Sequence, residues 1–86
     1  MLRTRNLTLS STPTLLTITD AIDAQNTISI QNTSDSATLY LGGPEVSSSS
    51  YGVKLLAGQI WSADFGAYDE LYAVGTGTIA VLILER

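Results

Sequence analysis

Three carboxylates in the second half of the chain, Asp64, Asp69 and Glu70, are the side chains best suited to catalysis. Two carboxylates that flank a sugar ring can hydrolyse a glycosidic bond, and aromatic side chains beside them would hold the ring. The aromatic residues close in sequence are Trp61, Phe65, Tyr68 and Tyr72. A single small β domain leaves little room for a deep cleft, and acidic residues are common at strand ends beside turns. We therefore expect a protein that is not an enzyme.

Other chemistry is restricted by the residue types that the chain lacks, because it contains no His and no Cys. Four consecutive serines, residues 47–50, need an adjacent base to act as nucleophiles, and only a buried, neutral Lys54 could serve. Asp20, Asp23 and Asn26 supply hard oxygen ligands at three-residue spacing. That pattern lacks the glycine and the terminal Glu of a calcium loop, which favours a solvated turn. We expect no catalytic residue, no metal and no cofactor.

The charge balance argues against nucleic acid as a partner. The chain has four basic and eight acidic residues, a net charge of −4. Affinity for nucleic acid comes largely from Lys and Arg side chains that neutralise phosphates. Arg3 and Arg5 stand near the N-terminus, where they either bind an acidic groove or are solvated.

No segment indicates secretion or a membrane span. Residues 1–6 lead into polar alternation instead of the continuous apolar core of a signal peptide. The longest apolar run, residues 79–84, is far shorter than a bilayer-spanning segment. We expect no membrane partner.

Alternation of polar and apolar residues predicts short β-strands, most clearly at residues 6–10, 27–31 and 37–41. Further segments rich in β-branched or aromatic residues lie at 14–19, 52–56, 59–64, 70–74 and 78–84. Turn-forming Gly, Asn, Asp and Pro residues separate these segments. The pattern predicts an all-β fold, a small antiparallel β-sandwich or jelly-roll-like barrel of about eight strands, in one domain over residues 1–86.

Oligomerisation is expected because the domain is small and lacks the usual covalent or metal staples. Hydrophobic residues make up 44% of the chain and charged residues 14%, so a monomer would expose much apolar surface. The last predicted strand is apolar on both faces, since Ala80, Leu82 and Leu84 alternate with β-branched residues. Such a strand is either central in the sandwich or sealed by another subunit. Residues 1–10 form either an edge strand or an extended arm.

Three segments give the chain a family resemblance. They are residues 28–33 (ISIQNT), residues 39–46 (LYLGGPEV) and residues 52–59 (GVKLLAGQ). The region from about residue 26 to residue 85 resembles small β-sandwich virion proteins of tailed bacteriophages, of the head decoration, cement or head-fibre type. The chain departs from the family pattern at residues 47–51, where it is rich in serine.

The resemblance implies a non-enzymatic virion structural protein that binds the outside of the capsid, as a trimer, and stabilises the shell. Its partner would be the major capsid protein, and it would reach the capsid surface after synthesis in the host bacterial cytoplasm. Two alternatives are a tail or connector component that pairs by strand addition, and a small carbohydrate-binding module that stacks sugars on Trp61 and the tyrosines. The candidate interface residues are Arg3, Arg5, Tyr51, Trp61, Tyr68, Leu82 and Leu84.

Overall fold

The computed structural model describes residues 2–17, 26–66 and 69–85, with the side chain of Glu85 excepted. The described residues form strands and loops, and none of them belongs to a helix that could cross a membrane. The strands are β1 (Leu2–Thr8), β2 (Thr14–Leu15), β3 (Asn26–Asn32), β4 (Leu39–Gly42), β5 (Val53–Leu55), β6 (Ile60–Phe65), β7 (Tyr72–Val74) and β8 (Thr78–Glu85). Each predicted strand has a counterpart, so the all-β prediction is confirmed.

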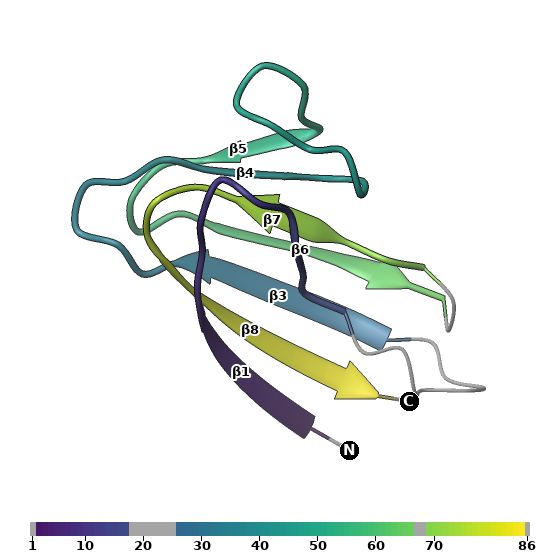
Figure 1. Ribbon diagram of the computed structural model, residues 1–86. Coiled ribbons are helices and arrows are strands. Elements are labelled where there is room, and N and C mark those ends of the chain that lie inside the picture. The colour runs from purple at the N-terminus through teal and green to yellow at the C-terminus, as the bar shows by residue number, and fades with distance from the viewer. Residues whose placement is uncertain (1, 18–25, 67–68, 86) are drawn as a thin grey trace.

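The strands make two antiparallel sheets of four strands each, packed face to face (Figure 1). One sheet has the order β1-β8-β3-β6, called here the first sheet, and the other has the order β2-β7-β4-β5, called the second sheet. The antiparallel pairs are nested, since β1 pairs with β8, β2 with β7, β3 with β6 and β4 with β5. A chain folded back on itself in this way and wrapped into two sheets is a jelly roll.

The core lies between the sheets and follows from the two-residue period of the strands. In the first sheet, Ile28, Ile30 and Val81 are at most 1% exposed. The second sheet contributes Leu39 and Leu41, which are fully buried. The other large side chains of the core are Leu9, Leu16, Leu55, Leu71, Ile79 and Ile83. The alternation in sequence thus gives each sheet one buried face and one outer face.

The N-terminal residues form an edge strand of the chain's own first sheet. Strand β1 pairs with β8 from Leu2 opposite Leu84 to Thr8 opposite Thr78. The strand begins four residues earlier than the pattern at residues 6–10 predicts. The pattern misses this start because Arg3 and Arg5 occupy inward positions, where alternation leads one to expect apolar side chains. The chain therefore enters and leaves the first sheet at the same end (Figure 1).

Candidate interaction surfaces

The outer face of the first sheet carries an unusual number of exposed apolar side chains. In β8, Val81 and Ile83 point into the core, whereas Leu82 and Leu84 are 42% and 41% exposed. Leu84 stands opposite Leu2 of β1, which is 60% exposed. The two apolar faces predicted for the last strand are both present: one is core and the other is surface.

The exposed residues continue across the sheet as a band. Ile60 of β6 is 66% exposed and borders a shallow hollow of about 200 Å³ that Thr4, Ala80 and Leu82 also line. The apolar band is defined as Leu2, Ile60, Ala80, Leu82 and Leu84. It runs diagonally over the outer face of the first sheet, from Leu2 and Leu84 at one end to Ala80 and Ile60 at the other, and exposed Gln31 of β3 lies between Ala80 and Ile60.

The remainder of this face is polar and nearly uncharged. Thr4, Ser29 and Ser62 occupy outward positions beside the band. Among the outward positions that the structure describes in these four strands, only Asp64 carries a charge, and it accepts a hydrogen bond of 2.8 Å from the Thr27 hydroxyl. Apolar anchors surrounded by uncharged polar groups are typical of the core of a protein interface.

Trp61 does not belong to this outer face. Its neighbours Ile60 and Ser62 point outward, so the indole lies on the inner side, half-buried and packed against the core. Its ring meets that of Phe65 edge to face at a centroid distance of 6.2 Å. The indole thus packs, partly buried, against the margin of the core and is not presented on the outer face as a platform for a sugar ring.

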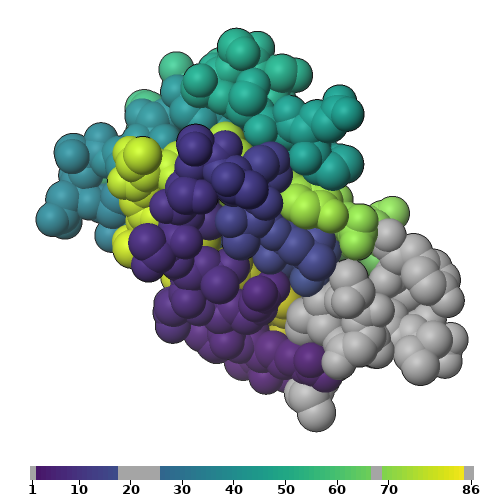
Figure 2. Space-filling view, in the orientation of Figure 1, coloured from purple at the N-terminus to yellow at the C-terminus, as the bar shows by residue number. Residues whose placement is uncertain are grey.

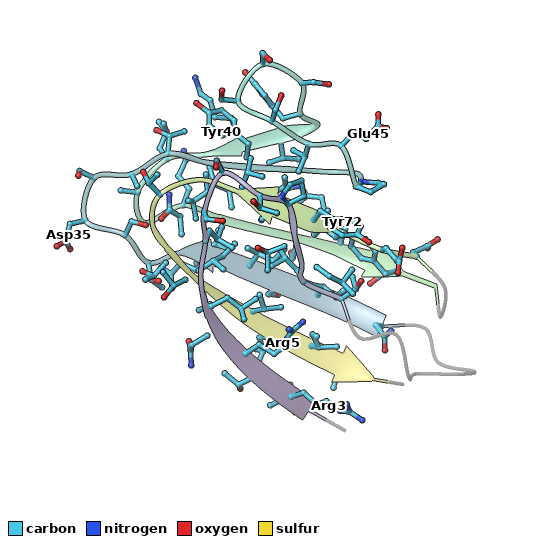
Figure 3. All side chains as sticks on the ribbon, viewed as in Figure 1. Arg3, Arg5, Asp35, Tyr40, Glu45 and Tyr72 are labelled. Atoms are coloured by element: carbon cyan, nitrogen blue, oxygen red, sulfur yellow. The ribbon has the colours of Figure 1, made fainter. Side chains whose placement is uncertain are left out.

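Arg5 also points inward, and its guanidinium binds the chain itself. Its Nη1 donates hydrogen bonds to the carbonyl oxygens of Leu15, Leu16 and Thr17 at 3.3, 2.9 and 3.5 Å. Arg3 is half-buried on the same side of β1 (Figure 3). Within the chain, Arg5 therefore fixes the first strand to the end of β2 and the two residues that follow it.

Tyr51 lies on the opposite side of the molecule from the apolar band. It is 45% exposed, and its ring meets that of Tyr40 at 4.9 Å with 47° between the planes. Tyr40 points outward from the second sheet, since its neighbours Leu39 and Leu41 are fully buried (Figure 3). Tyr40 thus forms an aromatic pair with Tyr51, which stands near the end of the loop between β4 and β5.

That loop, called here the serine loop (residues 43–52), projects from the second sheet (Figure 2). Its backbone closes on itself through a pair of hydrogen bonds between Ser47 and Ser50, at 2.8 and 3.2 Å. The Ser47 hydroxyl accepts from the amides of Ser49 and Ser50, and Val46 is buried beneath the loop. The serine run is therefore an exposed turn with its own hydrogen bonds.

The carboxylates considered for catalysis each have a local hydrogen-bond partner. Asp69 accepts from the Gly66 amide at 2.8 Å, and Glu70 accepts from the Tyr72 hydroxyl at 3.4 Å. Partial burial of the phenol, and then the nearby Glu70 carboxylate, raise the pKa of Tyr72. No group of three or more acidic side chains gathers within residues 2–17, 26–66 and 69–85. Tyr68, Asp20 and Asp23 lie outside the described residues.

Asn32 is a structural residue whose role the sequence pattern does not reveal. Its side chain is fully buried, and Nδ2 donates to the carbonyls of Ala37 at 2.8 Å and Leu55 at 3.0 Å. Its Oδ1 accepts from the Ser34 amide at 3.0 Å. Asn32 thereby joins β3 of the first sheet to β5 of the second. The sequence marks Asn32 only as the start of a turn.

Comparison with known proteins supports the fold. Neither a protein family model nor a curated protein matches this sequence. Among solved structures, the chain is similar to one from Bacillus endospore appendages, described as a novel family of disulfide-linked pili. The two share 12% sequence identity with a TM-score of 0.56, over 96% of this chain and 82% of the other. At this identity the likeness shows a shared β-sandwich fold.

Proposed function

We propose that this chain is a non-enzymatic structural protein of a tailed-bacteriophage virion, which binds the outside of the capsid and stabilises it. The apolar band on the outer face of the first sheet carries the proposal. Its partner is the major capsid protein, and the shell's threefold positions would gather the bound copies as trimers. The resemblance of residues 28–33, 39–46 and 52–59 to small virion proteins supplies the identity of the shell.

The size and composition of this face suit such a contact. The long dimensions of the molecule are 35 and 23 Å, so a contact would have to use most of one broad side to reach the roughly 800 Å² that one partner buries in an interface of standard size. Leu2, Leu82 and Leu84 would supply the apolar centre. Their removal from water is favourable, and the added contact across shell joints would raise the free energy needed to separate shell subunits.

Two further observations support a structural role. The similar chain from endospore appendages belongs to a pilus, so the same sandwich serves as a building unit there. That family is disulfide-linked, whereas this chain has no cysteine and would hold its partners without covalent bonds. The second observation is that Trp61 packs inward. This argues against the alternative hypothesis of a carbohydrate-binding module that stacks sugars on Trp61.

The experiment adds the purified chain to phage shells that lack it and measures co-sedimentation and the temperature at which the shells open. We expect the wild-type chain to bind and to raise that temperature. Leu82→Asp places a charge at the middle of the apolar band and should weaken binding at least tenfold. Leu56→Asp is the matched control, because Leu56 is 47% exposed in the loop between β5 and β6.

Equal binding by the wild type and Leu82→Asp would exclude the apolar band as the docking surface. Failure of the wild-type chain to bind any shell would contradict the capsid role itself. Circular dichroism of both variants establishes that each is folded before the shells are added.

A further inference from the structure

A second surface feature lies on the far side of the sandwich from the apolar band. It is a hollow of about 320 Å³ on the outer face of the second sheet, at the lower end of the size range of small-molecule sites. Val74 and Tyr40 stand opposite each other on neighbouring strands and form its base, and Gly75 completes the base. The remaining lining residues are Ser11, Thr38, Ser47, Ser48 and Thr76.

Among the residues that the structure describes, the polar side chains that line the hollow all carry hydroxyl groups and none is charged. Ser47 is used by its own turn, where it accepts from two backbone amides. Thr38, Ser48 and Thr76 differ, because among the described residues no protein group bonds to their hydroxyls. Each hydroxyl can donate one hydrogen bond and accept two. The lining of the hollow therefore includes several hydroxyl groups that the described part of the protein does not use.

The walls of the hollow are fixed before any ligand arrives. The serine loop is closed by its own hydrogen bonds and anchored by buried Val46. On the other side, Gly75 has a φ of 148°, its amide donates to the Ser10 carbonyl at 3.0 Å, and a Cβ at this position would collide with Leu39. A preformed site loses little conformational entropy when it binds a ligand.

These features fit one ligand chemistry. A charged ligand would give up its hydration without meeting an opposite charge. A neutral ligand rich in hydroxyl groups would exchange hydrogen bonds with Thr38, Ser48 and Thr76, while its carbon–hydrogen face packs on the Tyr40 ring. We propose that the hollow between the serine loop and the turn after β7 binds a neutral sugar residue of a glycan.

The position of the hollow is compatible with the proposed docking of the opposite face. The apolar band belongs to the outer face of the first sheet and the hollow to the outer face of the second, so one molecule can use both at once. Sugar binding does not depend on capsid binding, since the two surfaces share no lining residue.

The test titrates the isotopically labelled chain with glucose, galactose and N-acetylglucosamine and follows the backbone amide signals by NMR. We expect at least one sugar to shift the amides of Thr38, Ser48 and Thr76 in a saturable way, with a Kd on the order of 1 mM. Thr38→Val and Thr76→Val keep the side-chain shape, remove one hydroxyl each, and should weaken binding about 3- to 10-fold. Ser62→Ala, on the opposite face, should leave the affinity unchanged.

Two results would overturn the proposal. One is the absence of any shift at these amides with all three sugars at about 50 mM, far above the expected Kd. The other is binding of glucuronate or N-acetylneuraminate in place of the neutral sugars, since that would require a positive charge that the lining lacks. The amide spectrum of each variant shows directly whether it has kept the fold, so a variant that unfolds is recognised before its affinity is measured.

Discussion

A single guanidinium joins the first strand to the end of β2 and the two residues after it. Arg5 donates to three carbonyl oxygens there, the shortest bond being 2.9 Å to Leu16. Arg5→Gln cannot span the same distance and leaves these acceptors without their charged donor. We expect the free energy of unfolding to fall by about 1–3 kcal/mol, measured by urea denaturation.

The control for Arg5 is Lys54→Gln, which also removes one positive charge but at an exposed position on the second sheet. This change should alter the free energy of unfolding by less than about 0.5 kcal/mol. Similar losses in both variants would mean that net charge, and not the carbonyl contacts, gives Arg5 its effect.

Asn32 is the second residue on which the sandwich depends. Asn32→Ala removes two bonds to carbonyls and one from the Ser34 amide, and it leaves a small cavity at a fully buried site. The expected loss is about 2–4 kcal/mol of unfolding free energy. Asn6→Ala, on the exposed side of β1, is the matched control and should cost less than about 0.5 kcal/mol. A small loss for Asn32→Ala would show that water replaces the amide without cost.

At the scale of elements, the turn between β7 and β8 requires glycine. Gly75 has a positive φ of 148°, and a Cβ there would collide with the Leu39 side chain and lie 3.0 Å from the Thr38 carbonyl oxygen. We expect Gly75→Ala to destabilise the fold by about 2–4 kcal/mol, from backbone strain and from the displaced core leucine. Thermal unfolding measures the effect.

Gly43→Ala provides the comparison, because no heavy atom lies within 4 Å of its added Cβ and its φ is not positive. It should be neutral or stabilising by up to about 1 kcal/mol, since it restricts the unfolded chain. If Gly75→Ala were as harmless as Gly43→Ala, this would contradict the conclusion that the turn packs against Leu39 too closely for a Cβ atom.

The strands were predictable from sequence because period-two alternation and turn residues are local signals. The nested pairing was not, since β1 and β8 lie at opposite ends of the chain and nothing local selects their register. The inward direction of Trp61 was also not predictable, because it too depends on the pairing register of its strand. Both Ile60 and Trp61 are large and apolar, so the sequence alone does not say which of the two faces the core.

The candidate contacts divide in the same way. Leu82 and Leu84 could be predicted as contact residues because the last strand is apolar on both faces. In a two-sheet sandwich the opposing sheet covers only one face of that strand, so the other face is exposed. Arg5 looked like a surface cation, and its inward direction follows from the pairing of β1 with β8. The hydroxyl-lined hollow was not predictable at all, since it joins Ser11, Thr38 and Thr76 from three separate turns.

The whole molecule has two outer faces of different character. One carries the apolar band, with Asp64 as the charged residue among its described outward positions. The other carries the serine loop, the tyrosine pair and Lys54. The two proposals are compatible with this difference between the faces. A protein bound to a shell through its apolar face would leave its polar face, with the hydroxyl-lined hollow, open to a sugar from solution.

We expect the isolated chain to associate with itself through the apolar band, because Leu82 and Leu84 are 42% and 41% exposed in the single chain. Self-association and capsid binding would then compete for the same surface. We expect light scattering after size exclusion to give a mass above that of a single chain, a trimer being favoured, and we expect Leu82→Asp to shift the mass toward the monomer. A wild-type chain that stays monomeric at concentrations of about 100 μM, where even weak interfaces are populated, would contradict self-association. The apolar band would then be a surface that only the shell covers.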